Sequence, residues 1–279
     1  MAAHYIGIDI GGTSIKAGLI ENGKLQKTLT ADTQAHKGGE TTLKVIEKLI
    51  TQLITPTTEG IGIGVPGIVD RQKGIAYDIW NIKDWGEVHL KSILESEFSV
   101  SVSIDNDANC FAMGEKLFGK GSDFNNFVGV TLGTGVGAGI IQRGRLMDDA
   151  NCGSGEFGGL PYKDTILEDY CASHFFKHYH KIDGKTAYEK AKAGDAHCIK
   201  LFEEFALHLS VLVKTIMLTI DPQAIIFGGA IAKSFELFEP FLREQMKEFP
   251  FQKSVAALTL LSSDLENAGI YGAAAICQS

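Results

Sequence analysis

Two turns rich in glycine and threonine, each set between apolar strands, constrain this chain more than any other feature. They lie in the stretches IGIDIGGTSIKAGLI (residues 6–20) and VGVTLGTGVGAGII (residues 128–141). Glycine tolerates positive φ and lets the backbone approach a ligand closely, and successive backbone N–H groups in such turns bind anions. One such turn occurs in many hairpins. Two of them, about 120 residues apart, predict two halves that close on one polyphosphate, and therefore a nucleotide-using enzyme.

The spacing of apolar residues predicts an α/β chain whose second half repeats the plan of the first. The expected strands cover residues 4–10, 15–20, 24–31, 59–70, 100–104, 127–133, 136–142, 144–147, 223–229 and 256–261. The expected helices cover residues 39–54, 88–98, 168–180, 185–193, 195–220, 235–248 and 266–277, with another that opens at 105–107. We expect an N-terminal domain of residues 1–105, on which a last helix (265–279) packs back, and a larger C-terminal domain of residues 106–264.

Composition excludes several classes of protein. The net charge of −8 argues against non-specific nucleic-acid binding, which depends on Lys and Arg contacts to phosphate. The N-terminus shows no basic region followed by an apolar one, and no apolar run reaches the length of a membrane span, so a cytoplasmic location is expected. The five cysteines are dispersed without a CxxC pair, which favours buried or inert thiols over disulfides or zinc.

Six stretches, in this order, resemble the ROK family of sugar kinases and regulators within the actin-like, hexokinase-type ATPase superfamily. They are GIDIGGTSIKAGLI, GIGVPGIVD, IDNDANCFAMGE, GVTLGTGVGAGII, GSGEFGG and IIFGGAI, and they span residues 6 to about 232. The resemblance implies two ribonuclease-H-like domains around a cleft where sugar and ATP meet. It implies ATP-dependent phosphorylation of a hexose or an N-acetylhexosamine, most often at O6.

The first turn carries candidate groups for phosphate and metal. Asp9 ends the strand before GGTS, where a carboxylate can hold Mg²⁺ directly or through water; a turn-capping role is the alternative. Gly11, Gly12 and Thr13 offer backbone and hydroxyl donors to phosphate. Lys16 on the next strand adds positive charge, although a solvated strand lysine explains it nearly as well.

The second turn, Gly133, Thr134 and Gly135, is a second candidate for phosphate, with an empty hairpin turn as the alternative. Gly228 and Gly229 end a later strand. The resemblance implies that this later region packs against adenine or ribose.

The acceptor side of the reaction is predicted at the start of the helix that follows residue 104. Phosphoryl transfer requires an oriented hydroxyl that loses its proton, and the resemblance assigns the base to Asp107. Asn106 both donates and accepts hydrogen bonds, which suits a sugar diol. Helix capping explains Asn106 and Asp107 equally simply, but Asp105 is available as the cap and would leave Asp107 to act as the base.

The resemblance also implies sugar contacts at Glu156 of GSGEFGG and at Glu168 of ILEDYCAS, and a sugar-pocket loop at Pro66 and Gly67. A flexible loop for Glu156 and a helix surface for Glu168 are the alternatives. Gly159 stands where zinc-containing members have histidine, and their cysteine cluster is missing. We therefore expect no structural zinc, and ATP and Mg²⁺ as the cofactors.

Two other functions remain open from the sequence. A sugar-binding sensor of the same fold would bind sugar without consuming ATP, and a polyphosphate-dependent glucokinase would use another donor. No helix-turn-helix precedes the first turn, which disfavours a DNA-binding repressor. A homodimer is compatible with the resemblance, but no stretch identifies its contact surface.

Overall fold

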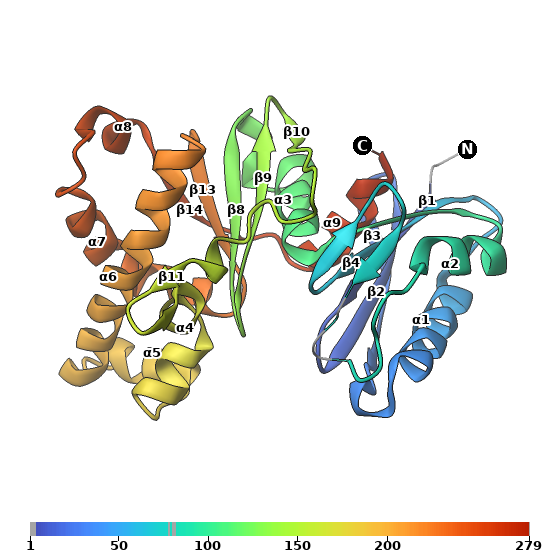
Figure 1. Ribbon diagram of the computed structural model, residues 1–279, viewed down its shortest axis with the longest axis horizontal. Helices are drawn as coiled ribbons and strands as arrows, with labels where there is room; N and C mark the ends of the chain where they lie inside the picture. The colour runs from blue at the N-terminus through green and yellow to red at the C-terminus, as the bar shows by residue number, and fades with distance from the viewer. Residues whose placement is uncertain (1–3, 78, 80–81, 279) are drawn as a thin grey trace. The chain divides into compact units, whose positions relative to one another are not determined.

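The computed structural model describes residues 4–77, 79 and 82–278 (Figure 1). Contacts within the chain divide it into two units. Unit 1 comprises Met1–Ser122, Arg145–Ser154 and Leu265–Ser279, and unit 2 comprises Asp123–Gly144 and Gly155–Asp264. The predicted boundary after residue 105 differs from this division, because helix α3 (Asp107–Phe118) packs extensively on helix α9 (Ala268–Ala275) inside unit 1.

Unit 1 is a five-stranded sheet with helices. Its elements, besides α3 and α9, are β1 (His4–Ile10), β2 (Ser14–Glu21), β3 (Lys24–Asp32), α1 (Gly39–Leu53), β4 (Thr58–Val65), β5 (Ile68–Asp70), β6 (Ile75–Tyr77), α2 (Leu90–Phe98), β7 (Ser101–Asn106) and β10 (Arg145–Leu146). The sheet order is β3-β2-β1-β4-β7. The β1–β2 and β2–β3 pairs are antiparallel, and the β1–β4 and β4–β7 pairs are parallel. The small β5–β6 hairpin was not expected from the sequence.

The central strands of unit 1 present isoleucine on one face and glycine on the other, because successive side chains of a strand alternate between faces. Ile6 and Ile8 of β1, like Ile61 and Ile63 of β4, are fully buried in the core that α1 and α2 cover. Figure 1 shows these two helices along one side of the sheet. Burial of these branched side chains is the main stabilising term for this layer.

The glycine face of the same strands receives α9 at very short range. A Cβ placed on Gly62 would lie 1.7 Å from the carbonyl oxygen of Ala273, and one on Gly7 would lie 2.0 Å from that of Ile270. On the other side of the helix, a Cβ on Gly272 would lie 1.8 Å from the carbonyl oxygen of Cys110 in α3. Only glycine permits these backbones to approach so closely.

Unit 2 repeats the strand plan of unit 1. Its elements are β8 (Phe127–Leu132), β9 (Val136–Gln142), β11 (Pro161–Tyr162), β12 (Thr165–Ile166), α4 (Leu167–Cys171), α5 (Gly184–Lys192), α6 (Ala196–Thr219), β13 (Ala224–Gly228), α7 (Phe235–Met246), α8 (Gln252–Ala257) and β14 (Thr259–Ser262). The strands pair in the order β9-β8-β13-β14, with β8–β9 antiparallel and the other two pairs parallel. This repetition confirms the predicted α/β fold.

The single helix predicted over residues 168–180 is wrong. Helix α4 ends at Cys171, and Ala172 has extended dihedral angles. The backbone N–H of Ser173 then donates a hydrogen bond to the carbonyl of Gly133, 2.8 Å away. The chain resumes as a π-helical turn over Phe175–Tyr179. A tertiary hydrogen bond therefore interrupts the helical pattern at the second glycine turn.

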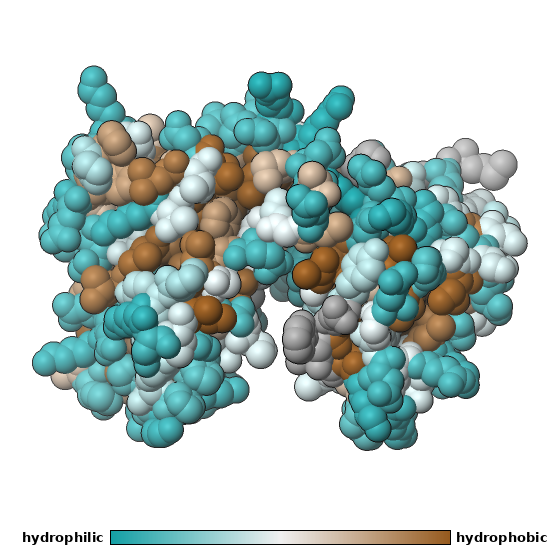
Figure 2. Space-filling model, viewed as in Figure 1, coloured by the Kyte–Doolittle hydropathy of each residue, from teal (hydrophilic) through white to brown (hydrophobic). Residues whose placement is uncertain are grey.

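Some apolar side chains remain at the surface of unit 2. Leu207 and Leu218 of α6 are exposed, and Figure 2 shows apolar surface over the region of α6. Nothing in the structure shows what covers them, so the homodimer stays a prediction. Within the described ranges, no helix is long and apolar enough to cross a bilayer. The cytoplasmic location also stays a prediction.

A buried histidine lies at the centre of an aromatic cluster in unit 2. His208 of α6 is only 1% exposed, and its Nδ1 lies 3.0 Å from the hydroxyl of Tyr162. Its ring also contacts the ring of Tyr170. Its Nε2 makes no hydrogen bond, and the nearest carboxylate oxygen, from Glu204, is 3.7 Å away. Burial, reinforced by the charge of Lys163, lowers the pKa of His208 to about 4.

We expect this histidine to make stability depend on pH. Its folded pKa is about 4, and its unfolded value is near 6.5, so the unfolded state binds more protons between these values. The free energy of unfolding is therefore highest above about pH 6.5, and it falls by up to roughly 3 kcal/mol as the pH is lowered towards 4. Urea unfolding followed by circular dichroism should show that the free energy of unfolding falls less over this pH interval in His208→Gln than in wild type. The exposed-site control His36→Gln should behave like wild type; equal losses in all three proteins contradict the prediction.

Candidate functional site

The first glycine turn is held from two neighbouring elements. The N–H of Gly11 donates to the carbonyl of Ser14 at 3.0 Å. Thr33, fully buried after β3, donates from its hydroxyl to the carbonyl of Gly11 at 2.7 Å, and its N–H donates to the carbonyl of Thr13. Gly12 and Thr13 are exposed. The turn is thus fixed at its base and presents its tip to solvent, which suits it to an anion.

Asp9 and Lys16 are two oppositely charged residues on the strands that flank this turn. They are directly opposite in the β1–β2 register. Asp9 is half-buried, and burial raises its pKa while the charge of Lys16 lowers it. A Cβ on Gly269, at the start of α9, would lie 2.5 Å from Oδ2 of Asp9. The carboxylate is therefore packed against the start of α9 and lacks full hydration.

This environment fits the predicted metal. Mg²⁺ usually keeps several waters and takes one or two carboxylates together with substrate phosphates. A single, partly desolvated carboxylate next to a phosphate-binding turn meets that requirement. In the part of the chain that the structure describes, no three His, Cys, Asp or Glu side chains are grouped to hold a metal on their own. Asp9 would accordingly hold Mg²⁺ only with the phosphates.

The predicted base stands at the first position of α3, directly after its N-cap. The cap is Asn106, whose side-chain oxygen accepts from the N–H of Ala108 at 2.8 Å, so the expectation that Asp105 caps the helix is wrong. Asn106 also donates from Nδ2 to the carbonyl of Gly67 at 2.9 Å. Gly67 has a φ of 114°, which favours glycine. Asn106 thus joins the loop of Pro66 and Gly67 to the helix start, and Asp107 beside it is half-buried.

A supporting network behind this helix start was missed from the sequence. The buried carboxylate of Asp105 accepts from the N–H of Asn106 at 2.7 Å and from Nδ2 of Asn109 at 2.8 Å. Arg71 places a guanidinium nitrogen 3.7 Å from the other oxygen of Asp105 and donates to the carbonyl of Met147 at 2.7 Å. Burial raises the pKa of Asp105, and these hydrogen bonds oppose the shift. The only signal in the sequence is that Asp105 precedes Asn109 by four residues where the strand ends and the helix begins.

The second glycine turn is tied to α4. The N–H of Gly133 donates to the carbonyl of Gly135 at 3.0 Å, and the N–H of Val136 donates to Oε2 of Glu168 at 2.8 Å. A Cβ on Gly135 would lie 2.4 Å from the same oxygen, whereas a Cβ on Gly133 would meet nothing within 4 Å. None of Gly11, Gly133 and Gly135 has positive φ. These glycines therefore provide close approach and open space rather than left-handed turns.

Glu156 lies in unit 2 on the loop before β11. Its side chain is exposed, yet partial burial and the charge of Glu168 raise its pKa. Gly155 before it has a φ of 86°, and a Cβ there would lie 2.0 Å from the carbonyl oxygen of Ala138. The glycines of GSGEFGG thus let the loop dock on β9. The two carboxylates of Glu156 and Glu168 are near enough to influence each other.

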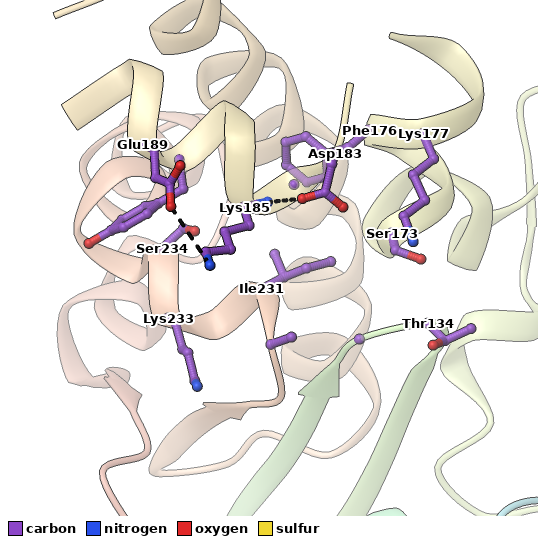
Figure 3. A pocket seen from close by; sticks show the side chains of 14 residues that line it. Thr134, Ser173, Phe176, Lys177, Asp183, Lys185, Glu189, Ile231, Lys233 and Ser234 are labelled. Carbon is purple, nitrogen blue, oxygen red and sulfur yellow. Dashed lines mark hydrogen bonds and ion pairs between the residues drawn. The ribbon is translucent and has the colours of Figure 1, made fainter. Parts of the chain in front are cut away.

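A cavity of about 570 Å³ in unit 2 begins at the second glycine turn. Its lining residues come from the turn, from the segment after α4, from α5 and from the segment after β13: Gly133, Thr134, Ser173, Phe176, Lys177, Asp183, Gly184, Lys185, Tyr188, Glu189, Ala230, Ile231, Lys233 and Ser234. The volume is typical of small-molecule sites. Figure 3 shows Thr134 at the strand end and the lysine side chains around the cavity.

Several polar groups of this cavity are already engaged within the protein. The carboxylate of Asp183 caps α5 by accepting from the N–H of Lys185 at 2.9 Å. Lys185 and Glu189 form an ion pair with an N–O distance of 3.9 Å. Lys177 lies on the same side of the cavity as Thr134, whereas Lys233 lies across the cavity from it (Figure 3). Lys177 makes the side beside Thr134 suitable for an anion, and Phe176 and Ile231 add apolar surface to the lining.

The later glycines predicted near the nucleotide lie beside this cavity rather than in its lining. Gly229 has a φ of 86°, and a Cβ there would lie 2.4 Å from the carbonyl oxygen of Leu132. This conformation turns the chain after β13 so that Ala230 and Ile231 line the cavity. Gly228 is the last residue of β13 and is buried. The sequence did not reveal the lysines of α5 and of the π-helical turn, since their spacing fits any solvated helix.

Comparison with known proteins decides the family. Residues 5–279 match the sequence profile of the ROK family. The chain belongs to the ROK family. A glucokinase of Thermotoga maritima is 30% identical, over 97% of this chain and 96% of the relative. A beta-glucoside kinase of Listeria innocua is 30% identical, over 95% of this chain and 94% of the relative.

A solved structure agrees with this assignment. A ROK family glucokinase from Streptomyces griseus, in complex with glucose and AMPPNP, is 26% identical. It superposes with a TM-score of 0.81 over 99% of this chain and 100% of the other. The predicted family and the predicted enzyme class, a sugar kinase, are confirmed.

Proposed function

We propose that this ROK protein transfers the γ-phosphoryl group of ATP to the O6 hydroxyl of a hexose or an N-acetylhexosamine. The observation that carries the proposal is the cavity of unit 2, which begins at the predicted phosphate turn Gly133–Thr134 and is lined by lysines. A site that combines apolar lining with a lysine beside the phosphate turn suits a nucleoside triphosphate. The AMPPNP complex of the Streptomyces relative supports the same donor.

Asp107 is the proposed general base. Its carboxylate would accept the proton of the sugar hydroxyl as the hydroxyl oxygen bonds to the γ-phosphorus and the bond from that phosphorus to the β–γ bridging oxygen breaks. The proton ends on Asp107 and the leaving group is ADP. The cap and the Asp105 network support this role, because they fix the helix start that carries the carboxylate.

The sugar is proposed to contact Asn106, the Pro66–Gly67 loop, Glu156 and Glu168. Asn106 donates to Gly67 through Nδ2, which holds its amide in one orientation. The two glutamates are assigned because the two oxygens of a carboxylate can accept hydrogen bonds from two neighbouring hydroxyls of a sugar. Relatives named glucokinase and beta-glucoside kinase support a glucose-like ring as the acceptor.

Mg²⁺ is proposed to bind beside Asp9 with the donor phosphates. The metal would offset phosphate charge there, and Lys16 and the N–H groups of Gly12 and Thr13 would orient the same phosphates. Because burial raises the pKa of Asp9, a cation next to this carboxylate also restores its charged form.

A coupled ADP-release assay tests the proposal. Mg-ATP is offered with glucose, mannose, fructose, allose, N-acetylglucosamine, N-acetylmannosamine and a β-glucoside, and we expect turnover with one or more of them. Identification of the product by NMR locates the phosphate at O6 or elsewhere. Turnover only with polyphosphate would replace ATP as the donor. Sugar binding without turnover on any donor would support the sensor and defeat the kinase.

A further inference from the structure

Glu168 makes a direct side-chain contact to the second glycine turn. Its Oε2 accepts a hydrogen bond from the N–H of Val136, with 2.8 Å between nitrogen and oxygen. The carboxylate lies where a Cβ of Gly135 would be, since such an atom would be 2.4 Å from Oε2 and 3.0 Å from Cδ. Glycine at position 135 is therefore what allows the carboxylate to reach the backbone of the turn.

The helix that carries Glu168 is anchored on its other side. Tyr170 packs against the rings of Tyr162 and His208, and its hydroxyl donates to Asp164. At the start of the helix, the N–H of Leu167 donates to the carbonyl of Leu160 at 2.9 Å. These contacts fix α4 against α6 and the β11–β12 hairpin. A carboxylate on so short a helix is thus held in place before any ligand binds.

Within the turn itself, the N–H of Gly133 donates to the carbonyl of Gly135 at 3.0 Å. Gly133 has open space on its side-chain position, and its carbonyl is held by the N–H of Ser173, which follows α4. Both of these links, from Glu168 and from Ser173, come from the segment 167–173. A hydrogen bond to a charged acceptor is about twice as strong as a neutral one, so Glu168 is the stronger of the two.

We propose that Glu168 is a positioning residue for the donor-phosphate turn, whether or not it also contacts the sugar. This inference rests on the proposed function, because it assumes that the turn binds the phosphates of ATP. A carboxylate next to phosphates repels them, so electrostatics gives no reason for its presence there. The structure offers another reason: the carboxylate accepts a hydrogen bond from the N–H of Val136, and this bond orders the turn.

The test measures nucleotide binding without sugar, so that loss of a sugar contact has no effect. AMPPNP with Mg²⁺ is titrated calorimetrically into wild type, Glu168→Ala, Glu168→Gln and the control Asp169→Ala, the next residue of the same helix. We expect Glu168→Ala to bind about tenfold more weakly. Glu168→Gln keeps an acceptor for Val136 and loses the charge, so we expect binding within about twofold of wild type, or tighter. Asp169→Ala should match wild type.

Hydrogen exchange of the unliganded protein supplies a second reading. Amides of residues 133–136 should exchange faster in Glu168→Ala than in wild type or Glu168→Gln, while amides of α6 keep their protection if the variant is folded. Equal AMPPNP affinity and equal exchange in Glu168→Ala and wild type overturn the inference. Absence of AMPPNP binding by wild type instead defeats the proposed donor, and the exchange comparison still decides whether Glu168 orders the turn.

Discussion

Asp107→Asn is expected to lower kcat about a thousandfold and to leave the affinity for ATP unchanged. Asparagine has the shape of aspartate and cannot take the proton of the sugar hydroxyl, and general-base catalysis contributes about 10² to 10⁴-fold. The side chain sits at the first position of α3, where the amide oxygen can still face the N–H of Ala108. Steady-state kinetics with the sugar found in the ADP-release assay measures the effect.

Two comparisons make the Asp107 result specific. Asp84→Asn makes the same chemical change at an exposed loop position and should retain full activity. Circular dichroism and AMPPNP titration should show that Asp107→Asn is folded and binds nucleotide. The base assignment is wrong if the folded variant turns over at a rate within a few-fold of wild type.

Gly62→Ala is expected to destabilise unit 1 by about 3 kcal/mol, near the upper end for overpacking a core. The new methyl group would lie 1.7 Å from the carbonyl oxygen of Ala273, and 2.5 Å from its carbonyl carbon. Backbone atoms cannot rotate aside as a side-chain end can, so α9 must move off the sheet. For a unit of this size we expect a fall of roughly 10 °C in its unfolding temperature.

Tryptophan fluorescence measures this change selectively, because neither of the two tryptophans in the sequence falls within the residue ranges of unit 2 and Trp85 is buried in unit 1. Gly86→Ala is the matched control. A Cβ on Gly86 meets nothing within 4 Å, and its φ lies outside the left-handed region. This control should shift the transition by less than about 0.5 kcal/mol. Identical transitions for the two variants would show that α9 adapts to the added methyl group at no cost.

Most elements of this fold could be predicted from local sequence. The β1–β2 and β8–β9 hairpins around the glycine turns, the amphipathic α1 and the long α6 all lie within a few residues of their expected bounds. In these elements the apolar residues recur regularly over several helical turns or along a whole strand, because one face of the element is buried. The short elements were missed: β11, β12 and α8 have too few residues for periodicity to be seen.

The candidate site was predicted in part for a similar reason. Motifs located the two turns, Asp107 and Asn106, but not Arg71, Asp105 as a buried acceptor, or the lysines of the cavity. The roles of these groups depend on contacts with residues distant in the sequence; Arg71, for example, donates a hydrogen bond to the carbonyl of Met147. The end of α4 was placed wrongly because a hydrogen bond from Ser173 to Gly133 stops the helix, and no local signal marks it.

The sequence by itself determined the order of strands and helices, the repeated plan and the ROK family, because these are encoded in periodicity and in motifs that local geometry requires. Only the tertiary structure decided what the glycines of β1 and β4 are for. In the sequences HYIGIDI and EGIGIGV they are part of buried strands; in space they leave room for the backbone of α9. Likewise, only packing against the turn revealed that Glu168 bonds to Val136. The close approach of two backbones depends on two segments that are distant in the sequence, so the local pattern of either segment does not reveal it.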